Sequence, residues 1–109
     1  MDRTAVINEI KRRLVEKFNP QAIILFGSSA RGEARPGSDI DLLVLTPIEG
    51  NYTDLWYAMY DSVSDLEGSK DIVLMTPAQF ERGKKYIGTL ARPAWLEGKV
   101  LYERERSLC

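Results

Sequence analysis

The stretch AIILFGSSARGEARPGSDIDLLVL, residues 22–45, decides how this chain folds. Its first five residues form an unbroken apolar run, which is typical of a strand buried on both faces. Residues 27–38 hold three glycines, three serines and one proline, so we expect a loop there. Residues 40–45 predict a second strand, which Asp39 directly precedes. The stretch therefore predicts two strands of one sheet, with acidic residues where the second strand begins.

The flanking sequence predicts the other elements through its periodicity and its stop signals. An amphipathic helix is expected over residues 3–18, where apolar residues recur at steps of three and four and Asn19-Pro20 then ends the pattern. Thr76-Pro77-Ala78-Gln79 has the threonine, proline and glutamine of a capped helix start. The remaining expected elements are a helix over 53–66, a strand over 71–75, a helix from 77 to about 86, a short helix over 92–96 and a strand over 100–102.

This order of elements predicts an α+β (α/β) fold, a small mixed β-sheet with helices covering one face. The 109 residues suit a single domain over residues 1–109. Residues 103–109 are charged near their start and are expected to fray as a tail.

Composition excludes several kinds of catalysis. The chain has no histidine, which removes Ser-His-Asp and Cys-His catalysis and histidine-ligated zinc or haem. Its one cysteine, Cys109, cannot form an intrachain disulfide. The net charge of −1 gives no reason to expect stable nucleic-acid binding. No apolar run approaches the roughly 20 residues of a membrane span, and no apolar leader follows Met1, so a cytoplasmic protein is expected.

Carboxylates must then supply most of the acids, bases and metal ligands of any active site. Asp39 and Asp41 are two residues apart, so a strand would direct both side chains to the same face. Asp71 opens the third predicted strand and can join them if that strand lies beside the second. Clustered carboxylates repel one another unless a cation lies among them. Mg²⁺ is the cation that such oxygen ligands favour, and we expect two ions.

The glycine–serine turn after the first strand predicts a phosphate site. Gly27 lets the backbone approach a ligand closely, and the Ser28 hydroxyl can donate a hydrogen bond to a phosphate oxygen. Arg31 can clamp a terminal phosphate, and Ser38 is a further polar candidate. A phosphate site beside carboxylate-bound metal ions is what nucleotidyl transfer requires. Without histidine, Asp71 is the expected base for the acceptor hydroxyl.

Each of these features alone is more often structural than functional. A Gly-Ser pair after a strand is usually a turn, an Asp-x-Asp pair is common on surfaces, and Arg31 can simply be solvated. The combination is more specific, because two like charges at the head of the apolar strand 40–45 cost stability without a structural benefit.

Residues 27–34, GSSARGEA, followed by residues 38–44, SDIDLLV, resemble the signature of the DNA polymerase β-like nucleotidyltransferase superfamily. In its length, the chain is similar to members of the minimal nucleotidyltransferase (MNT) branch of this superfamily. The resemblance implies that Asp39 and Asp41 bind metal, that Asp71 is the third carboxylate, and that Gly27 and Ser28 hold the triphosphate. Because the third carboxylate varies across the superfamily, Asp61 and Asp65 are alternatives.

The resemblance also implies a partner. Minimal members are often paired with a HEPN-domain ribonuclease toxin, and there the nucleotidyltransferase is an antitoxin that transfers AMP from ATP to a toxin tyrosine. The exposed aromatic candidates for that contact are Trp56, Tyr57, Tyr60 and Trp95, although aromatic residues at helical spacing more often belong to a core. The alternatives are a non-catalytic antitoxin module and transfer to a small molecule such as an aminoglycoside. The sequence leaves base specificity, the acceptor and homo-oligomer formation open.

Overall fold

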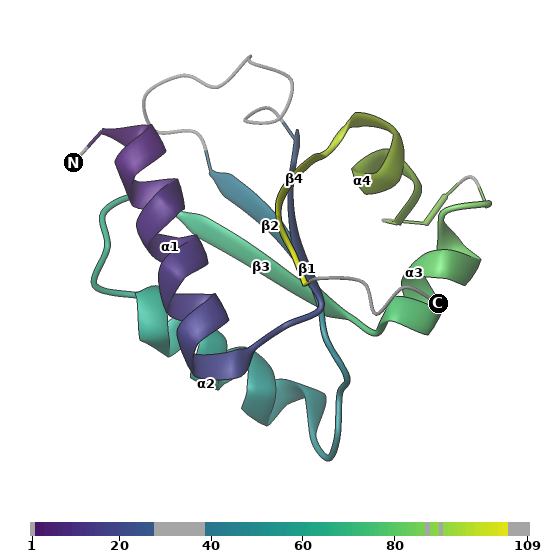
Figure 1. Ribbon diagram of the computed structural model, residues 1–109, viewed down its shortest axis with the longest axis horizontal. Helices are drawn as coiled ribbons and strands as arrows, with labels where there is room; N and C mark the ends of the chain where they lie inside the picture. Colours follow the sequence, from purple (N-terminus) through teal and green to yellow (C-terminus); the bar gives the residue numbers. More distant parts are fainter. Residues whose placement is uncertain (1, 28–38, 87, 90, 105–109) are drawn as a thin grey trace.

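Four helices and four strands make up the parts of the chain that the computed structural model describes, residues 2–27, 39–86, 88–89 and 91–104 (Figure 1). In chain order they are α1 (Arg3–Phe18), β1 (Ala22–Phe26), β2 (Ile40–Leu45), α2 (Tyr52–Val63), β3 (Lys70–Met75), α3 (Pro77–Gly83), α4 (Ala91–Glu97) and β4 (Lys99–Glu103). Every element expected from the sequence is present, and the bounds of α1, β1 and β2 are those predicted.

The strands form one mixed sheet in the order β3-β2-β1-β4. β1 runs antiparallel to β2 and β4, whereas β2 and β3 are parallel. A register shift in the β1–β4 pair falls between Ile23 and Ile24. The α+β class and the mixed sheet are therefore confirmed, and the parallel β2–β3 pair brings the starts of those two strands to the same end of the sheet.

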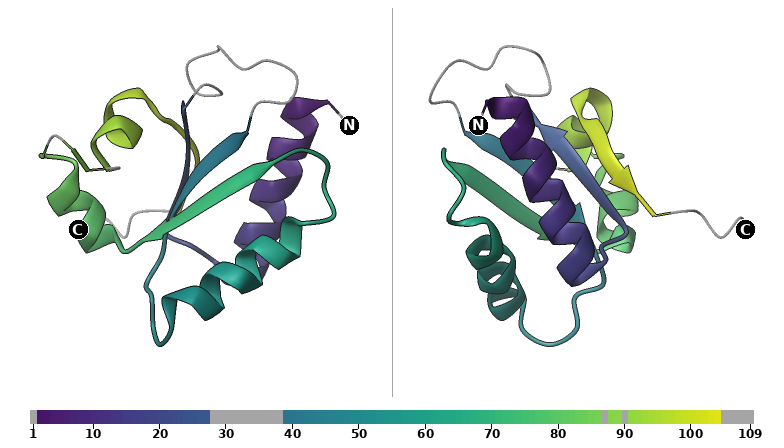
Figure 2. Two further views of the ribbon diagram at one scale, coloured as in Figure 1. Left: turned by 180° about the vertical axis from the view of Figure 1, so that it is seen from behind. Right: turned by 60° about the vertical axis from the view of Figure 1, so that its left-hand side comes forward.

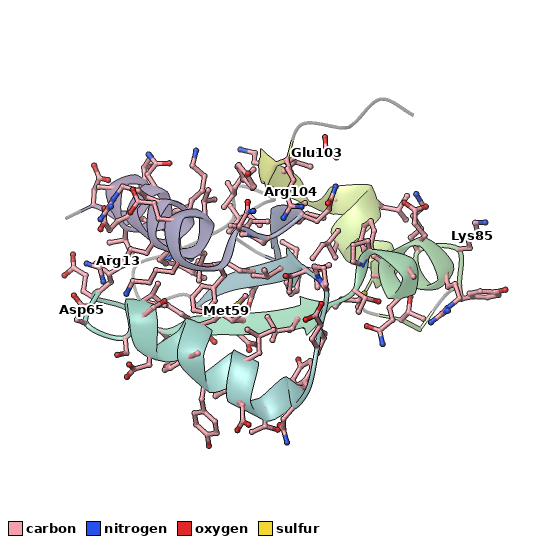
Figure 3. The ribbon with its side chains drawn as sticks, turned by 60° about the horizontal axis from the view of Figure 1, so that its bottom comes forward. Arg13, Met59, Asp65, Lys85, Glu103 and Arg104 are labelled. Atoms are coloured by element: carbon pink, nitrogen blue, oxygen red, sulfur yellow. The ribbon has the colours of Figure 1, made fainter. Side chains whose placement is uncertain are left out.

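The two longest helices cover one face of the sheet (Figure 2). α1 contributes Val6, Ile10 and Leu14 to a core cluster with alternate residues of the strands. α2 adds Met59, which lies between the helix and the sheet (Figure 3), and Val63. This face carries most of the large, fully buried side chains.

The short helices α3 and α4 pack against the opposite face. Among their described side chains, Phe80 from α3 and Ala91 and Ala94 from α4 contact the strand residues that point away from α1 and α2. The expectation that helices cover only one face is therefore wrong. Residue alternation already placed apolar side chains on both faces of β1 and β2, and a second layer is needed to bury them.

Helix ends follow local capping. Asp2 caps α1, where its Oδ1 accepts a hydrogen bond from Ala5 N at 2.8 Å. Asn51 caps α2 by accepting from Thr53 N and Asp54 N, so that this helix begins at Tyr52 rather than Thr53. Thr76 and Gln79 form the predicted capping box of α3, but the helix ends at Gly83, earlier than expected.

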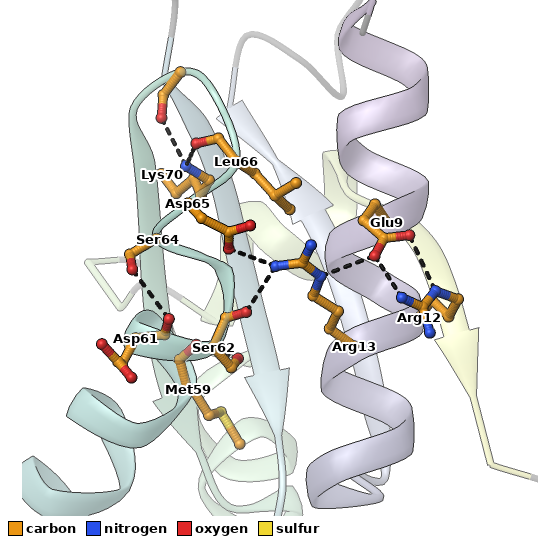
Figure 4. A network of polar contacts seen from close by, with 11 residues as sticks. Glu9, Arg12, Arg13, Met59, Asp61, Ser62, Ser64, Asp65, Leu66 and Lys70 are labelled. Atoms are coloured by element: carbon orange, nitrogen blue, oxygen red, sulfur yellow. Dashed lines mark hydrogen bonds and ion pairs between the residues drawn. The ribbon is translucent and has the colours of Figure 1, made fainter.

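A polar network joins α1 to the end of α2 (Figure 4). Arg13 donates to Glu9 at 2.8 Å, to the Ser62 main-chain oxygen at 3.0 Å and to Asp65 at 2.5 Å. Arg12 also contacts Glu9. Hydrogen bonds from Arg12 and Arg13 lower the pKa of Glu9 to about 2, and the bond from Arg13 lowers that of Asp65.

Aromatic side chains of α2 reach the outer strand β3. Trp56 Nε1 donates to the Ile72 main-chain oxygen at 2.7 Å, and the Tyr52 hydroxyl accepts from Leu74 N at 3.2 Å. Trp56 stacks on Tyr60 with ring centroids 5.1 Å apart. None of the helices in the described segments combines the length and apolar character that a membrane crossing requires.

Candidate active site

The register of the sheet places Asp41 beside Asp71. In the parallel β2–β3 pair these two residues are direct partners, and on its other side Asp41 is the partner of Phe26. Neighbouring strands lie about 4.8 Å apart, so the two carboxylates start from adjacent backbone positions. The proximity that the sequence predicted for Asp41 and Asp71 is therefore present at the backbone level.

Strand alternation places both carboxylates on the face that α3 and α4 cover. Ile40 and Leu42 belong to the cluster under α1 and α2, and Leu43 belongs to the opposite cluster. Asp41 must then point to the same side as Leu43. α4 packs against β1. At the end of the sheet where β2 and β3 begin, Asp41 is half-buried and Asp71 is exposed.

Gly27 packs directly against the Asp41 side chain. Its φ angle is 74°, in the left-handed region that favours glycine. A Cβ at this position would lie 3.3 Å from Asp41 Cγ and would overlap Oδ2. The sequence predicted that Gly27 permits a close approach, and the group that approaches in the structure is the carboxylate of Asp41.

Asp39 lies one residue before β2 and is exposed. Its main-chain oxygen accepts a hydrogen bond at 2.8 Å from Arg3 Nη2, which comes from the first residue of α1. The next amide, Ile40 N, donates to the Ser69 oxygen at 2.9 Å. Sequence reasoning gave Arg3 no role, because its partner is 36 residues away and no local pattern indicates the contact.

The predicted phosphate-binding residues Ser28, Arg31 and Ser38 lie outside the described residues. Their roles, and the loop in which the sequence places them, stay predictions. Of the predicted phosphate site, the structure describes only Gly27, at the end of β1.

The carboxylates suit a divalent cation in their chemistry and in their strand register. Asp41 and Asp71 are adjacent oxygen donors on one face, of the kind that Mg²⁺ prefers. Within the described residues, however, no three acidic, histidine or cysteine side chains are gathered closely enough to hold an ion. The described residues therefore provide two neighbouring carboxylates, Asp41 and Asp71, with Asp39 one residue before β2. The metal-binding roles of all three stay predictions.

Asp71 is better placed as the third carboxylate than Asp61 or Asp65. Asp65 is held by Arg13 at 2.5 Å in the network between α1 and α2. Asp61 lies on α2 (Figure 4). This helix packs on the face of the sheet opposite Asp41. Neither alternative shares a face with Asp41, whereas Asp71 does.

The aromatic residues expected at a partner contact divide into two kinds. Trp56 and Tyr60 pack partly into the core. Tyr57 is 63% exposed and remains available for contact. The Trp95 side chain lies outside the described residues. A pocket of about 580 Å³, lined in part by Leu74, Met75 and Thr76, lies at the end of β3 far from Asp71.

The model of the nucleotidyltransferase domain family matches residues 7–102, which include β1, β2, β3 and the aspartates Asp39, Asp41 and Asp71. This chain belongs to that family. Among curated relatives, the "Putative protein adenylyltransferase" of Methanocaldococcus jannaschii is 37% identical to this chain over 70 residues. These residues make up 63% of this chain and 70% of the relative. The resemblance drawn from the sequence is confirmed.

Solved structures agree with this assignment. A chain from a toxin–antitoxin complex crystallised with AMP-PNP superposes on this chain with a TM-score of 0.65 and 25% sequence identity. The superposition covers 90% of this chain and 73% of the other. A chain from a complex of a tri-AMPylated HEPN toxin of Shewanella oneidensis with its MNT antitoxin has a TM-score of 0.57 and 23% identity, and covers 92% and 71%. The second likeness concerns the fold alone.

Proposed function

We propose that this nucleotidyltransferase transfers AMP from ATP to a tyrosine hydroxyl of a HEPN-type ribonuclease partner and thereby acts as an antitoxin in the cytoplasm. The observation that carries the proposal is the pairing of Asp41 with Asp71. Beside this pair lies Gly27, where any side chain would overlap the Asp41 carboxylate. The adenylyltransferase name of the archaeal relative and the AMPylated toxin in the Shewanella complex support the nucleotide and the acceptor.

Asp39, Asp41 and Asp71 would hold Mg²⁺, with two ions expected. When bound, Mg²⁺ supplies charge stabilisation for the attacking and leaving oxygens. Gly27, Ser28, Arg31 and Ser38 would hold the triphosphate, with the arginine countering the charge of a terminal phosphate. This division assigns the carboxylates to the strands and the phosphate contacts to the segment between β1 and β2.

The proposed reaction is an in-line displacement at the α-phosphorus. The tyrosine oxygen forms a bond to this phosphorus while the bond to the bridging oxygen breaks, and pyrophosphate leaves with that oxygen. Asp71 accepts the hydroxyl proton. Its exposure suits the task, because an acceptor from another protein must reach the base from solvent.

The acceptor tyrosine would come from the partner, whose surface would contact this chain beside the nucleotide site. Tyr57, the most exposed of the α2 aromatic residues, is a candidate contact. A second copy of this chain remains an alternative provider of that surface.

Incubation of the protein with Mg²⁺, α-labelled ATP and a HEPN-type partner tests the proposal. Labelled partner is expected with the wild-type protein and not with Asp41→Asn or Asp71→Asn. Asp61→Asn is the matched control, because this exposed aspartate lies on the opposite face and should leave transfer unchanged. Absence of transfer from every nucleotide, together with no binding of Mg-ATP, would reject the enzymatic role.

A non-catalytic antitoxin module is the second candidate. It is favoured by the finding that no three metal-binding side chains are gathered in the described part of the chain. The double variant Asp39→Asn/Asp41→Asn separates the two: neutralisation of the partner would persist for a binding module and fail for an enzyme. Labelling of aminoglycosides in an acceptor screen would instead indicate a small-molecule substrate.

A further inference from the structure

Arg3 connects the first turn of α1 to the main chain at the acidic pair. Its Nη2 donates to the Asp39 main-chain oxygen at 2.8 Å, and its Nε is buried from solvent. A hydrogen bond from a charged donor is among the stronger ones in proteins. Arg3 therefore fixes a specific point of the backbone, at the residue where the chain enters β2.

The peptide unit between Asp39 and Ile40 has both of its polar groups fixed. Its carbonyl accepts from Arg3, and its N–H donates at 2.9 Å to the Ser69 oxygen, just before β3. The orientation of this peptide plane determines where the flanking Cα–Cβ bonds point, and thus the directions of the Asp39 and Asp41 side chains. Through Ser69 the same unit is also joined to the chain two residues before Asp71.

Arg3 makes this contact from the side of the sheet that α1 covers. α1 packs over Ile40 and Leu42, whereas Asp41 points to the opposite side of β2. The guanidinium thus binds main chain at the end of the sheet, on the side from which Asp41 points away.

We propose that Arg3 is a positioning residue for nucleotidyl transfer: by holding the Asp39–Ile40 peptide between α1 and Ser69, it fixes the placement of Asp39, Asp41 and Asp71 before the nucleotide binds. The effect of Arg3 on nucleotidyl transfer rests on the function proposed above. Its effect on the Asp39–Ile40 peptide does not, because that peptide can be studied in the protein without ligand.

The test uses Arg3→Ala, Arg3→Lys and the control Arg13→Ala. Arg13 is matched in three ways: it lies on α1, it donates to a main-chain oxygen at 3.0 Å, and it joins α1 to another element. Two quantities are measured for each variant. The first is the hydrogen-exchange rate of the Ile40 amide without ligand, relative to global stability. The second is the Kd for Mg-AMP-PNP.

Arg3→Ala is expected to speed Ile40 exchange and to raise the Kd, each by about tenfold, the usual effect of losing one charge-assisted hydrogen bond. Arg3→Lys should bring the exchange rate and the Kd part of the way back to their wild-type values. If the alanine variant does not fold, the lysine variant alone provides the test. Arg13→Ala should lower the melting temperature without a selective effect on Ile40 or on the Kd.

Ile40 exchange that is unchanged in both Arg3 variants, or changed equally by Arg13→Ala, would overturn the positioning role. If the wild-type protein does not bind Mg-AMP-PNP, the proposed function fails, while the exchange rates still decide the role of Arg3. Selective exchange at Ile40 with an unchanged Kd would show that the contact is purely structural, and would also overturn the proposal.

Discussion

The two faces of the sheet differ in what covers them. α1 and α2, of 16 and 12 residues, cover one face with large apolar side chains and are joined by the Glu9–Arg13–Asp65 network. α3 and α4, of seven residues each, cover the other face, where their buried side chains among the described ones are Phe80, Ala91 and Ala94. Asp41 and Asp71 lie on the face that α3 and α4 cover. The large apolar cluster under α1 and α2 and the two carboxylates therefore lie on opposite faces of the same strands.

The largest effect is expected from the heavily covered face. Leu14 lies on α1 and is fully buried, so Leu14→Ala should lower the free energy of unfolding by about 2–5 kcal/mol. Urea denaturation followed by circular dichroism measures the loss. At a temperature where the variant is folded, its Kd for Mg-AMP-PNP should equal that of the wild type. A shifted Kd would mean that the two faces are coupled.

Asp41→Asn should have the opposite pattern, a large loss of activity with little loss of stability. Removing one anionic metal ligand is expected to reduce AMP transfer by at least about 100-fold. The unfolding free energy should change by far less, because Asp41 is half-buried and the replacement keeps its shape. Transfer kinetics and a melting curve on the same preparation check both parts. Severe unfolding of this variant would contradict the separation of the two faces.

Gly27→Ala should affect both properties moderately. A residue with a Cβ costs about 1–2 kcal/mol in the left-handed region, and the added carbon would overlap the Asp41 carboxylate. We therefore expect a loss of stability of about this size together with reduced transfer.

A double-mutant cycle sharpens the prediction for Gly27. With Asp41→Ala in the background, the overlap with Oδ2 disappears, so Gly27→Ala should cost less than in the wild type. Equal costs in the two backgrounds would show that the strained backbone alone explains the effect.

The smallest effect concerns pH. Arg12 and Arg13 depress the pKa of Glu9 from its ordinary value of 4.5 to about 2 in the folded protein. The folded state therefore binds fewer protons here than the unfolded state, and the resulting stability is present above pH 4.5 and lost as the pH falls toward 2. Glu9→Gln should flatten the dependence of the urea midpoint on pH in this window.

Local signals explain why much of the fold could be predicted. The bounds of α1, β1 and β2 followed from helical periodicity, from Asn19-Pro20 and from an unbroken apolar run. The capping box at Thr76 was also visible in the sequence. α2 was misplaced by one residue at its start, because the Asn51 side chain caps the helix ahead of Thr53.

The parts that could not be predicted depend on contacts between distant residues. Strand order, the helices on the second face and the Arg3–Asp39 bond all arise from tertiary packing. The candidate site was partly predictable, since Asp41 and Asp71 open strands that prove to be parallel neighbours. Whether Asp39 joins them as a metal ligand depends on side-chain placement that strand spacing does not determine.

The contacts of Trp56 and Tyr52 with β3 have a consequence for self-association. A border strand normally offers unpaired amide and carbonyl groups to strands of other molecules, which is a route to aggregation. Here the indole and the phenol already bond to Ile72 and Leu74. β3 is thereby protected from strand addition along the segment that continues from Asp71, and the acidic end of the sheet stays accessible to soluble partners.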